Sequence, residues 1–236
     1  MTGNEYDRTR QLWARWAGFL LVATNGTAIV AFVVRSNLMA ARDPMQTAAN
    51  ISGAEGLFRL GLAFDLLTVA GLIPLMAGLY IALKPIGRNL AMLGMLWRLV
   101  ECVVLALLTV ASFTALALLG GGAFMRGLDP GAAADLAFTL VRVHGAGFQI
   151  AFLFLGLGQL AFSLLWWRSG YVPRWLAGLG ILASAVMAAM ALGIILWPPL
   201  YRMTGMAYMM PMGLYELGLG LWLMVRGLRL PADGSS

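Results

Sequence analysis

The stretch TLVRVHGAGFQIAFLFLGLGQLAFSLLWW, residues 139–167, decides the fold of this chain. Its second part, residues 150–167, is strongly apolar and carries no charged side chain. Because a helix needs about 20 mostly apolar residues to cross the hydrocarbon core of a bilayer, this part predicts a membrane-spanning helix. Arg142, His144 and Gln149 precede it directly. Polar side chains at that position predict a polar site buried between membrane helices.

The composition of the whole chain agrees with a membrane protein. Of 236 residues, 61% are hydrophobic and only 11% are charged, whereas soluble domains carry roughly 25% charged residues. The net charge of +6 does not indicate a nucleic-acid partner, because the basic residues lie at helix ends rather than along one stripe. Cys102 is the only cysteine, which excludes a disulfide framework within the chain.

Long apolar runs recur along the sequence, so we predict an all-α polytopic membrane helix bundle that forms one domain over residues 1–236. Short basic or glycine- and proline-containing segments separate the runs. The six expected spans are approximately residues 13–34, 57–83, 89–119, 136–166, 174–197 and 207–226.

Lysine and arginine residues between the spans predict the orientation, because cytoplasmic loops carry an excess of them. One side holds nine: Arg8, Arg10, Arg15, Lys84, Arg88, Arg168, Arg174, Arg226 and Arg229. The other side holds four: Arg35, Arg42, Arg126 and Arg202. Both termini are therefore expected in the cytoplasm.

Three local patterns predict helix starts in the outer loops. Asp43–Pro44 and Asp129–Pro130 each combine an N-cap residue with proline at the first helical position. Ser52 with Glu55 fits a capping box. The first outer loop is expected to hold a short helix of its own.

Four ionisable residues are predicted at similar depths in four different spans. Asp65, Glu101, His144 and Glu216 each lie roughly 12 Å below the outer surface, at about 1.5 Å of rise per residue. Ionisable side chains inside a membrane are costly, so they usually face the protein interior and find partners there. Together they predict a buried polar layer in the outer half of the bilayer.

The third span carries the clearest polar face. Arg98 and Glu101 are three residues apart, which allows an ion pair on one helix. Such a pair could equally be structural, and Asp65 could pair with an arginine such as Arg98. Glu216 has no basic residue within four positions on its own helix, which favours a functional role. The full stripe comprises Arg98, Glu101, Cys102, Leu105, Thr109 and Ser112.

In the fourth span the polar residues point in different directions. At about 100° per residue, His144 is rotated well away from both Arg142 and Gln149. A packing histidine and a proton-carrying histidine remain equally open for His144. Gln149, Gln159 and Asn25 are expected to form hydrogen bonds between helices.

The loop before the last span is rich in methionine, whose thioether suits Cu(I). An apolar return into the sixth span explains the same composition, so copper is a weak alternative. No other metal is indicated. The residues concerned are Met203, Met206, Met209, Met210 and Met212.

The residue inventory excludes several cofactors. The only lysine, Lys84, lies at a span end, which excludes a mid-membrane retinal Schiff base. A bis-histidine haem needs two histidines, and the chain has one. The sequence identifies no cofactor and leaves open whether the protein is an enzyme.

Several stretches resemble a family of bacterial membrane proteins described only as a domain of unknown function. The resemblance covers nearly the whole chain, and RSGYVPR is its most specific part. It implies a multi-pass protein of the bacterial inner membrane and brings no activity, substrate or cofactor. Asp65, Arg98, His144 and Glu216 lie within the recognisable stretches. These stretches are EGLFRLGLAFDLL (55–67), KPIGRNLAMLGMLWRLVE (84–101), HGAGFQIAFLFLGLGQL (144–160), RSGYVPR (168–174) and YELGLGLWLMVRG (215–227).

Three functions remain open from the sequence. The polar layer could serve proton-linked transport or the binding of a small or lipophilic ligand, because histidine and buried carboxylates can exchange protons. It could be the structural core of a non-catalytic membrane subunit or sensor. It could also belong to an intramembrane enzyme for a lipid-like substrate, with His144 as general acid and base. The lipid bilayer is the expected partner, and the oligomeric state is open.

Overall fold

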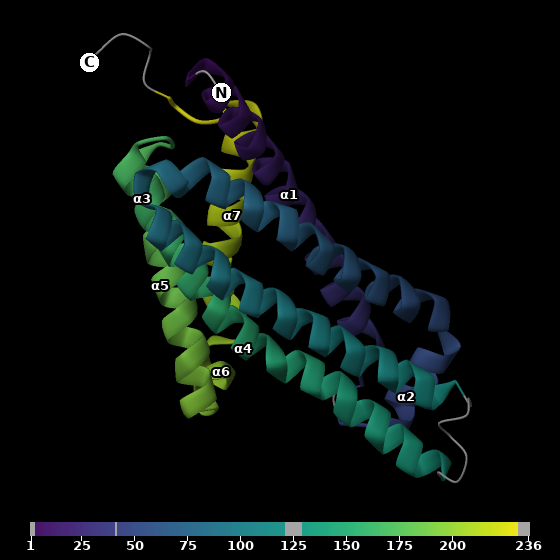
Figure 1. Ribbon diagram of the computed structural model, residues 1–236. Helices are drawn as coiled ribbons and strands as arrows, with labels where there is room; N and C mark the ends of the chain where they lie inside the picture. The colour runs from purple at the N-terminus through teal and green to yellow at the C-terminus, as the bar shows by residue number, and fades with distance from the viewer. Residues whose placement is uncertain (1–2, 41, 121–128, 231–236) are drawn as a thin grey trace. The chain divides into compact units, whose positions relative to one another are not determined.

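A computed structural model of the chain describes residues 3–40, 42–120 and 129–230, and the regular structure in these residues is helical throughout. The long helices of Figure 1 follow the apolar runs of the sequence. The elements in chain order are α1 (Gly3–Leu38), α2 (Pro44–Gly53), α3 (Glu55–Leu119), α4 (Pro130–Ser169), α5 (Arg174–Leu196), α6 (Pro199–Thr204), the short 3₁₀ helix η2 (Ala207–Met209) and α7 (Met210–Val225).

Four of these helices, α1, α3, α4 and α5, are long and apolar enough to cross a membrane. This confirms the prediction of an all-helical protein with membrane-spanning character. The count of six spans stays a prediction. The helix α7 has only 16 residues, because residues 207–209 form the separate 3₁₀ helix that precedes it.

Helix α3 contains two of the predicted spans, residues 57–83 and 89–119, without a loop between them. It is 65 residues long and leaves helical geometry at Gly87, where φ is −174° and ψ is 86°. Pro85 lies two residues earlier and has no backbone N–H to continue the hydrogen-bond ladder. The expected break between these two spans is therefore present at Gly87, where α3 consists of two helices joined at a kink.

The helix starts follow the sequence in two cases and depart from it in one. The Asp43 carboxylate accepts a hydrogen bond from the Gln46 backbone N–H at 2.9 Å and caps α2, whose first residue is proline. The Asp129 carboxylate accepts from the Gly131 N–H at 3.0 Å, beside the start of α4. The capping box at Ser52 is wrong, because α2 extends through Ser52 and the α3 N-cap is Ala54 without a side-chain cap.

The chain divides into two compact units by the contacts between its residues. Unit 1 comprises residues 1–25, 71–102 and 149–236, and unit 2 comprises residues 26–70 and 103–148. Helices α1, α3 and α4 each contribute to both units. A single domain over the whole chain stays a prediction.

Small residues allow close helix contacts in unit 1. A Cβ atom at Gly18 of α1 would lie 2.7 Å from the Gly220 carbonyl oxygen of α7. A Cβ atom at Gly156 of α4 would lie 2.6 Å from the Ala188 backbone nitrogen of α5. Such distances require glycine, and they bring helix backbones together as in other membrane bundles.

Unit 1 also explains the RSGYVPR stretch. The buried Arg10 guanidinium donates to the Tyr171 hydroxyl at 2.7 Å and to the Ala82 carbonyl at 3.2 Å. The Tyr171 carbonyl accepts from the Arg229 backbone N–H at 3.0 Å. The stretch therefore ties the start of α1, the middle of α3 and the C-terminal segment to one turn.

Unit 2 has a conventional apolar core. Residues from α1, α2, α3 and α4 pack together there and are all at most 9% exposed. The Thr27 and Thr68 hydroxyls form a hydrogen bond of 2.7 Å between α1 and α3. The core residues are Val34, Leu38, Ile51, Phe58, Leu62, Ala115, Leu116, Ala137 and Val141.

Candidate functional site

Unit 1 contains a buried cluster of charged residues, which we call the acid cluster: Arg98, Glu101, Glu216 and Asn25. The Arg98 Nη1 atom lies 2.9 Å from the Glu101 Oε2 atom on the same helix, α3. The same nitrogen lies 3.7 Å from the Glu216 Oε1 atom on α7. Asn25 of α1 donates from Nδ2 to the other Glu216 oxygen at 3.1 Å. The predicted Arg98–Glu101 pair is thus present, and one guanidinium serves two acids.

Glycine on α4 fixes the position of the arginine. A Cβ atom at Gly158 would lie 2.6 Å from Arg98 Cγ, so the arginine stem lies directly against the α4 backbone. A Cβ atom at Gly94, one turn earlier on α3, would lie 3.1 Å from the Gly158 carbonyl oxygen. The two helices approach closely because both positions lack a side chain.

The charges of the acid cluster do not balance. Arg98, Glu101 and Glu216 are 2%, 5% and 7% exposed, so all three lie away from the surface. Within the described residues, Arg98 is the only cation that forms an ion pair with either carboxylate. With both acids ionised, the cluster carries one excess negative charge. An uncompensated charge in apolar surroundings is strongly unfavourable, so the cluster requires a further positive charge.

Several polar atoms in this part of unit 1 lack a well-oriented hydrogen bond within the described chain. They include Glu101 Oε2, Glu216 Oε1 and both polar atoms of Gln159, which is 0% exposed. The Gln159 amide reaches the hydroxyl of Tyr215, the residue before Glu216. Ser163 donates to that hydroxyl at 2.9 Å. Buried polar groups are normally paired, so these atoms have capacity for a proton, a water molecule or a polar ligand group.

Unit 2 contains a separate, balanced ion pair. Arg35 on α1 donates through Nη2 to the Asp65 carboxylate on α3, and both side chains are about nine-tenths buried. The suggested pairing of Asp65 with Arg98 is therefore wrong. So is the assignment of Arg35 to an outer loop, because α1 continues through Leu38 and carries Arg35 inward. Arg126, another cation of that predicted side, lies outside the described residues.

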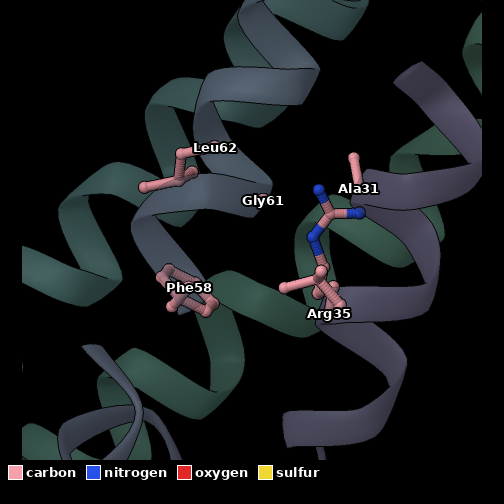
Figure 2. Close-up of a pocket in the computed structure, with 6 residues that line it drawn as sticks. Ala31, Arg35, Phe58, Gly61 and Leu62 are labelled. Atoms are coloured by element: carbon pink, nitrogen blue, oxygen red, sulfur yellow. The ribbon is translucent and has the colours of Figure 1, made fainter. Parts of the chain in front are cut away.

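A small pocket lies next to this ion pair. Figure 2 shows the Arg35 guanidinium between the helix segment that carries Ala31 and the segment that carries Gly61. The remaining lining is apolar and includes Phe58 and Leu62. The pocket is too narrow to hold a water molecule in this conformation. This pocket therefore offers no room for a small ligand beside Arg35.

His144 also lies in unit 2, and its hydrogen bonds indicate which ring nitrogen carries the hydrogen. Its Nδ1 atom is 2.8 Å from the Leu108 carbonyl oxygen and 2.8 Å from the Ser112 hydroxyl. A carbonyl oxygen only accepts, so Nδ1 carries the hydrogen. In the neutral ring, Nε2 then carries the lone pair. Nδ1 is consequently unable to take a proton from Ser112, which argues against a serine nucleophile activated by this histidine.

The remaining candidates lie apart from the acid cluster. Gln149, at the start of the unit 1 part of α4, accepts from the Tyr208 hydroxyl at 2.8 Å, an interhelical bond of the expected kind. Arg142 is exposed, and its guanidinium lies 5.6 Å from the centre of the Phe138 ring. Gln149 and Arg142 thus each have local contacts of their own.

The common metal-ligating side chains are not grouped in the described part of the chain. Within the described residues, no group of three or more His, Cys, Asp or Glu side chains is arranged to hold a metal ion. Among the copper candidates, Met203, Met206 and Met210 are exposed and Met212 is buried. The weak copper proposal thus gains nothing from the fold.

The predicted polar layer therefore corresponds to two local arrangements. Glu101 and Glu216 meet at Arg98 in unit 1, whereas Asp65 and His144 lie in unit 2. Asn25 was expected to bond between helices, and it binds Glu216. The sequence analysis missed Arg35 as the partner of Asp65, although Arg35 comes directly after a predicted span.

Comparison with known proteins gives a family and no activity. Residues 16–227 match the family described as "Domain of unknown function (DUF4386)". A relative from the archaeon Archaeoglobus fulgidus, described as an "Uncharacterized protein", is 28% identical over 158 residues, which cover 64% of this chain and 74% of the relative. No solved structure matches the chain.

Proposed function

This chain belongs to the DUF4386 family, and for it we propose proton-linked transport or binding of a small or lipophilic ligand across or within a membrane. The acid cluster of unit 1 is the proposed site. Glu101 and Glu216 bind and release one exchangeable proton between them, and Arg98 holds the two carboxylates together. The observation that carries this proposal is that two buried carboxylates share a single guanidinium.

The charge balance supports a proton as the exchanging species. One proton bound by either acid makes the cluster neutral, and its release restores one negative charge. Glu101 and Glu216 both lie near one Nη1 atom of Arg98, at 2.9 Å and 3.7 Å, so a charge bound by one acid is felt by the other. A cationic ligand would neutralise the cluster equally well, so proton and ligand can compete for the same excess charge. Such competition is the physical basis of proton-coupled exchange.

The geometry favours this function over an enzymatic one. The only histidine has its Nδ1 hydrogen held by a backbone carbonyl, and the neighbouring serine gains no activation from it. The acid cluster contains carboxylates, an amide and a guanidinium, which suit the binding of a proton or a charged ligand group. A purely structural role for the cluster is the second candidate, supported by the close glycine contacts around Arg98.

Proton flux in proteoliposomes separates the two candidates. We expect wild-type protein to carry protons down an imposed pH gradient, and Glu216→Gln or Glu101→Gln to abolish this flux while the folded yield stays normal. Glu55→Gln is the matched control, since Glu55 is an exposed acid paired with Arg59. Normal flux in both cluster variants would exclude the proposed site, and loss of folded protein in both would support the structural role.

A further inference from the structure

An open groove on unit 1 has the character of a lipid-binding site. It is a hollow of about 350 Å³ lined by Leu12, Arg15, Trp16 and Phe19 of α1 and by Met224 of α7. The groove lies next to the contact of Gly18 with Gly220, where the two helix backbones meet. Because these glycines draw the helices together, the larger side chains beside them form walls around an open space.

The walls are apolar and exposed. Leu12, Trp16 and Phe19 are 57%, 55% and 47% exposed. The Trp16 and Phe19 rings meet edge to face, with centroids 5.9 Å apart, which gives the groove a firm side. On a helix long and apolar enough to cross a membrane, such a groove faces lipid and has room for part of an acyl chain.

Two basic side chains lie at or near the groove. Arg15 lines the groove, and the exposed Arg226 follows Met224 by two residues. Within the described residues, neither arginine forms an ion pair with an acid. Tryptophan beside arginine is typical of the interface between lipid headgroups and acyl chains. The predicted orientation assigns this end of α1 to the cytoplasmic leaflet, where anionic lipids attract basic side chains.

We propose that this groove binds one anionic phospholipid, with Arg15 on the headgroup phosphate and an acyl chain between Trp16, Phe19 and Met224. The site is independent of the acid cluster and does not rest on the proposed proton exchange. Headgroup charge sets the preference, because the apolar walls serve an acyl chain of any phospholipid equally. A single basic side chain near a membrane surface contributes about 1 kcal/mol, which corresponds to roughly fivefold in affinity.

Native mass spectrometry of the detergent-purified full chain tests this proposal. Phosphatidylglycerol and phosphatidylcholine with identical acyl chains are the probes. We expect one phosphatidylglycerol molecule to bind more tightly than phosphatidylcholine. Arg15→Gln should lower the phosphatidylglycerol affinity about fivefold, and Arg15→Lys should largely retain it. Trp16→Ala should weaken both lipids.

Arg174→Gln is the matched control, because Arg174 is exposed beside the exposed Trp175 and does not line this groove. Its lipid affinity should equal that of the wild type. Equal affinities of the wild type for both lipids would overturn the proposal. So would equal losses in Arg15→Gln and Arg174→Gln, or a lipid-free dimer that covers the groove with a second copy. Retained helical circular dichroism and a monodisperse elution profile establish that each variant is folded.

Discussion

The two units bury their charges in opposite ways. Unit 2 pairs one arginine with one aspartate, so the charges of Arg35 and Asp65 balance. Unit 1 gives a single arginine two glutamates, so Arg98, Glu101 and Glu216 leave one charge over. Both arrangements are formed by buried side chains on helices of one chain, but only the second needs an additional proton or cation to become neutral. Stoichiometry, rather than burial alone, distinguishes a structural pair from a site.

This difference predicts opposite responses to the same chemical change. Replacing a carboxylate by its amide removes one negative charge and keeps the shape of the side chain. In unit 2 this change creates an unpaired buried cation, whereas in unit 1 it creates a neutral pair.

The largest effect is expected from Arg98→Met, which keeps a stem against Gly158 and removes the only cation of the acid cluster. Two buried carboxylates then lack a neutralising cation, so the free energy of unfolding should fall by about 3–5 kcal/mol. Protons neutralise carboxylates, so the loss should be greatest at alkaline pH and shrink as pH falls. Thermal unfolding in detergent, followed by tryptophan fluorescence across pH, measures it. Adding Glu101→Gln and Glu216→Gln to this variant should restore most of the stability, and failure to do so would contradict the charge argument.

Asp65→Asn should lower the free energy of unfolding by about 3 kcal/mol, because it leaves Arg35 buried without its partner. The measurement is the same thermal unfolding experiment at neutral pH. The double variant Arg35→Gln with Asp65→Asn removes both charges and should recover most of the loss. An Asp65→Asn protein as stable as the wild type would show that the unit 2 pair is not a closed structural element.

Glu216→Gln and Glu101→Gln should each lower the free energy of unfolding by much less than the roughly 3–5 kcal/mol expected for Arg98→Met, because each leaves one arginine with one glutamate and no unpaired buried charge. The variant Glu101→Gln with Glu216→Gln leaves Arg98 alone and should be much less stable than either. Thermal unfolding of the three proteins side by side tests this pattern. A strong loss in each single variant would make unit 1 equivalent to unit 2 and remove the contrast.

The smallest effect is expected from Ser112→Ala. Ser112 shares the Nδ1 hydrogen of His144 with the Leu108 carbonyl, which remains in place when the hydroxyl is lost. The loss should stay at or below about 1 kcal/mol, the usual contribution of a neutral hydrogen bond. The ¹⁵N NMR spectrum of the imidazole should still show the hydrogen on Nδ1. A shift of that hydrogen to Nε2 would contradict the assignment to the carbonyl.

The sequence predicts the helices well because long apolar runs have few alternatives in a membrane. It also predicts the Arg98–Glu101 contact, since residues three apart on a helix are neighbours. It also predicts the break between the second and third spans, since Pro85 lacks the backbone N–H that would continue the helix and the geometry is non-helical at Gly87.

Long-range partners are where sequence reasoning fails most clearly. Glu216 meets Arg98 across more than a hundred residues, and no local pattern connects them. Arg35 stands at the end of an apolar run, where a cation normally indicates topology, and its pairing with Asp65 depends on where α1 ends. The position of the hydrogen on the His144 ring depends on the Leu108 backbone carbonyl, and a backbone contact is not predictable from residue types.

The most direct test of the excess charge is infrared difference spectroscopy of the purified protein between alkaline and acidic pH. A protonated carboxyl group has a carbonyl band that the ionised form lacks. The exposed acids contribute to this band in every variant, so the comparison is of band area. We expect the wild-type band to exceed that of Glu216→Gln and of Glu101→Gln by the contribution of one carboxyl group, and to equal that of Asp65→Asn. Equal band areas in the wild type and both cluster variants, or a reduction only in Asp65→Asn, would contradict the proposal that the acid cluster holds the exchangeable proton.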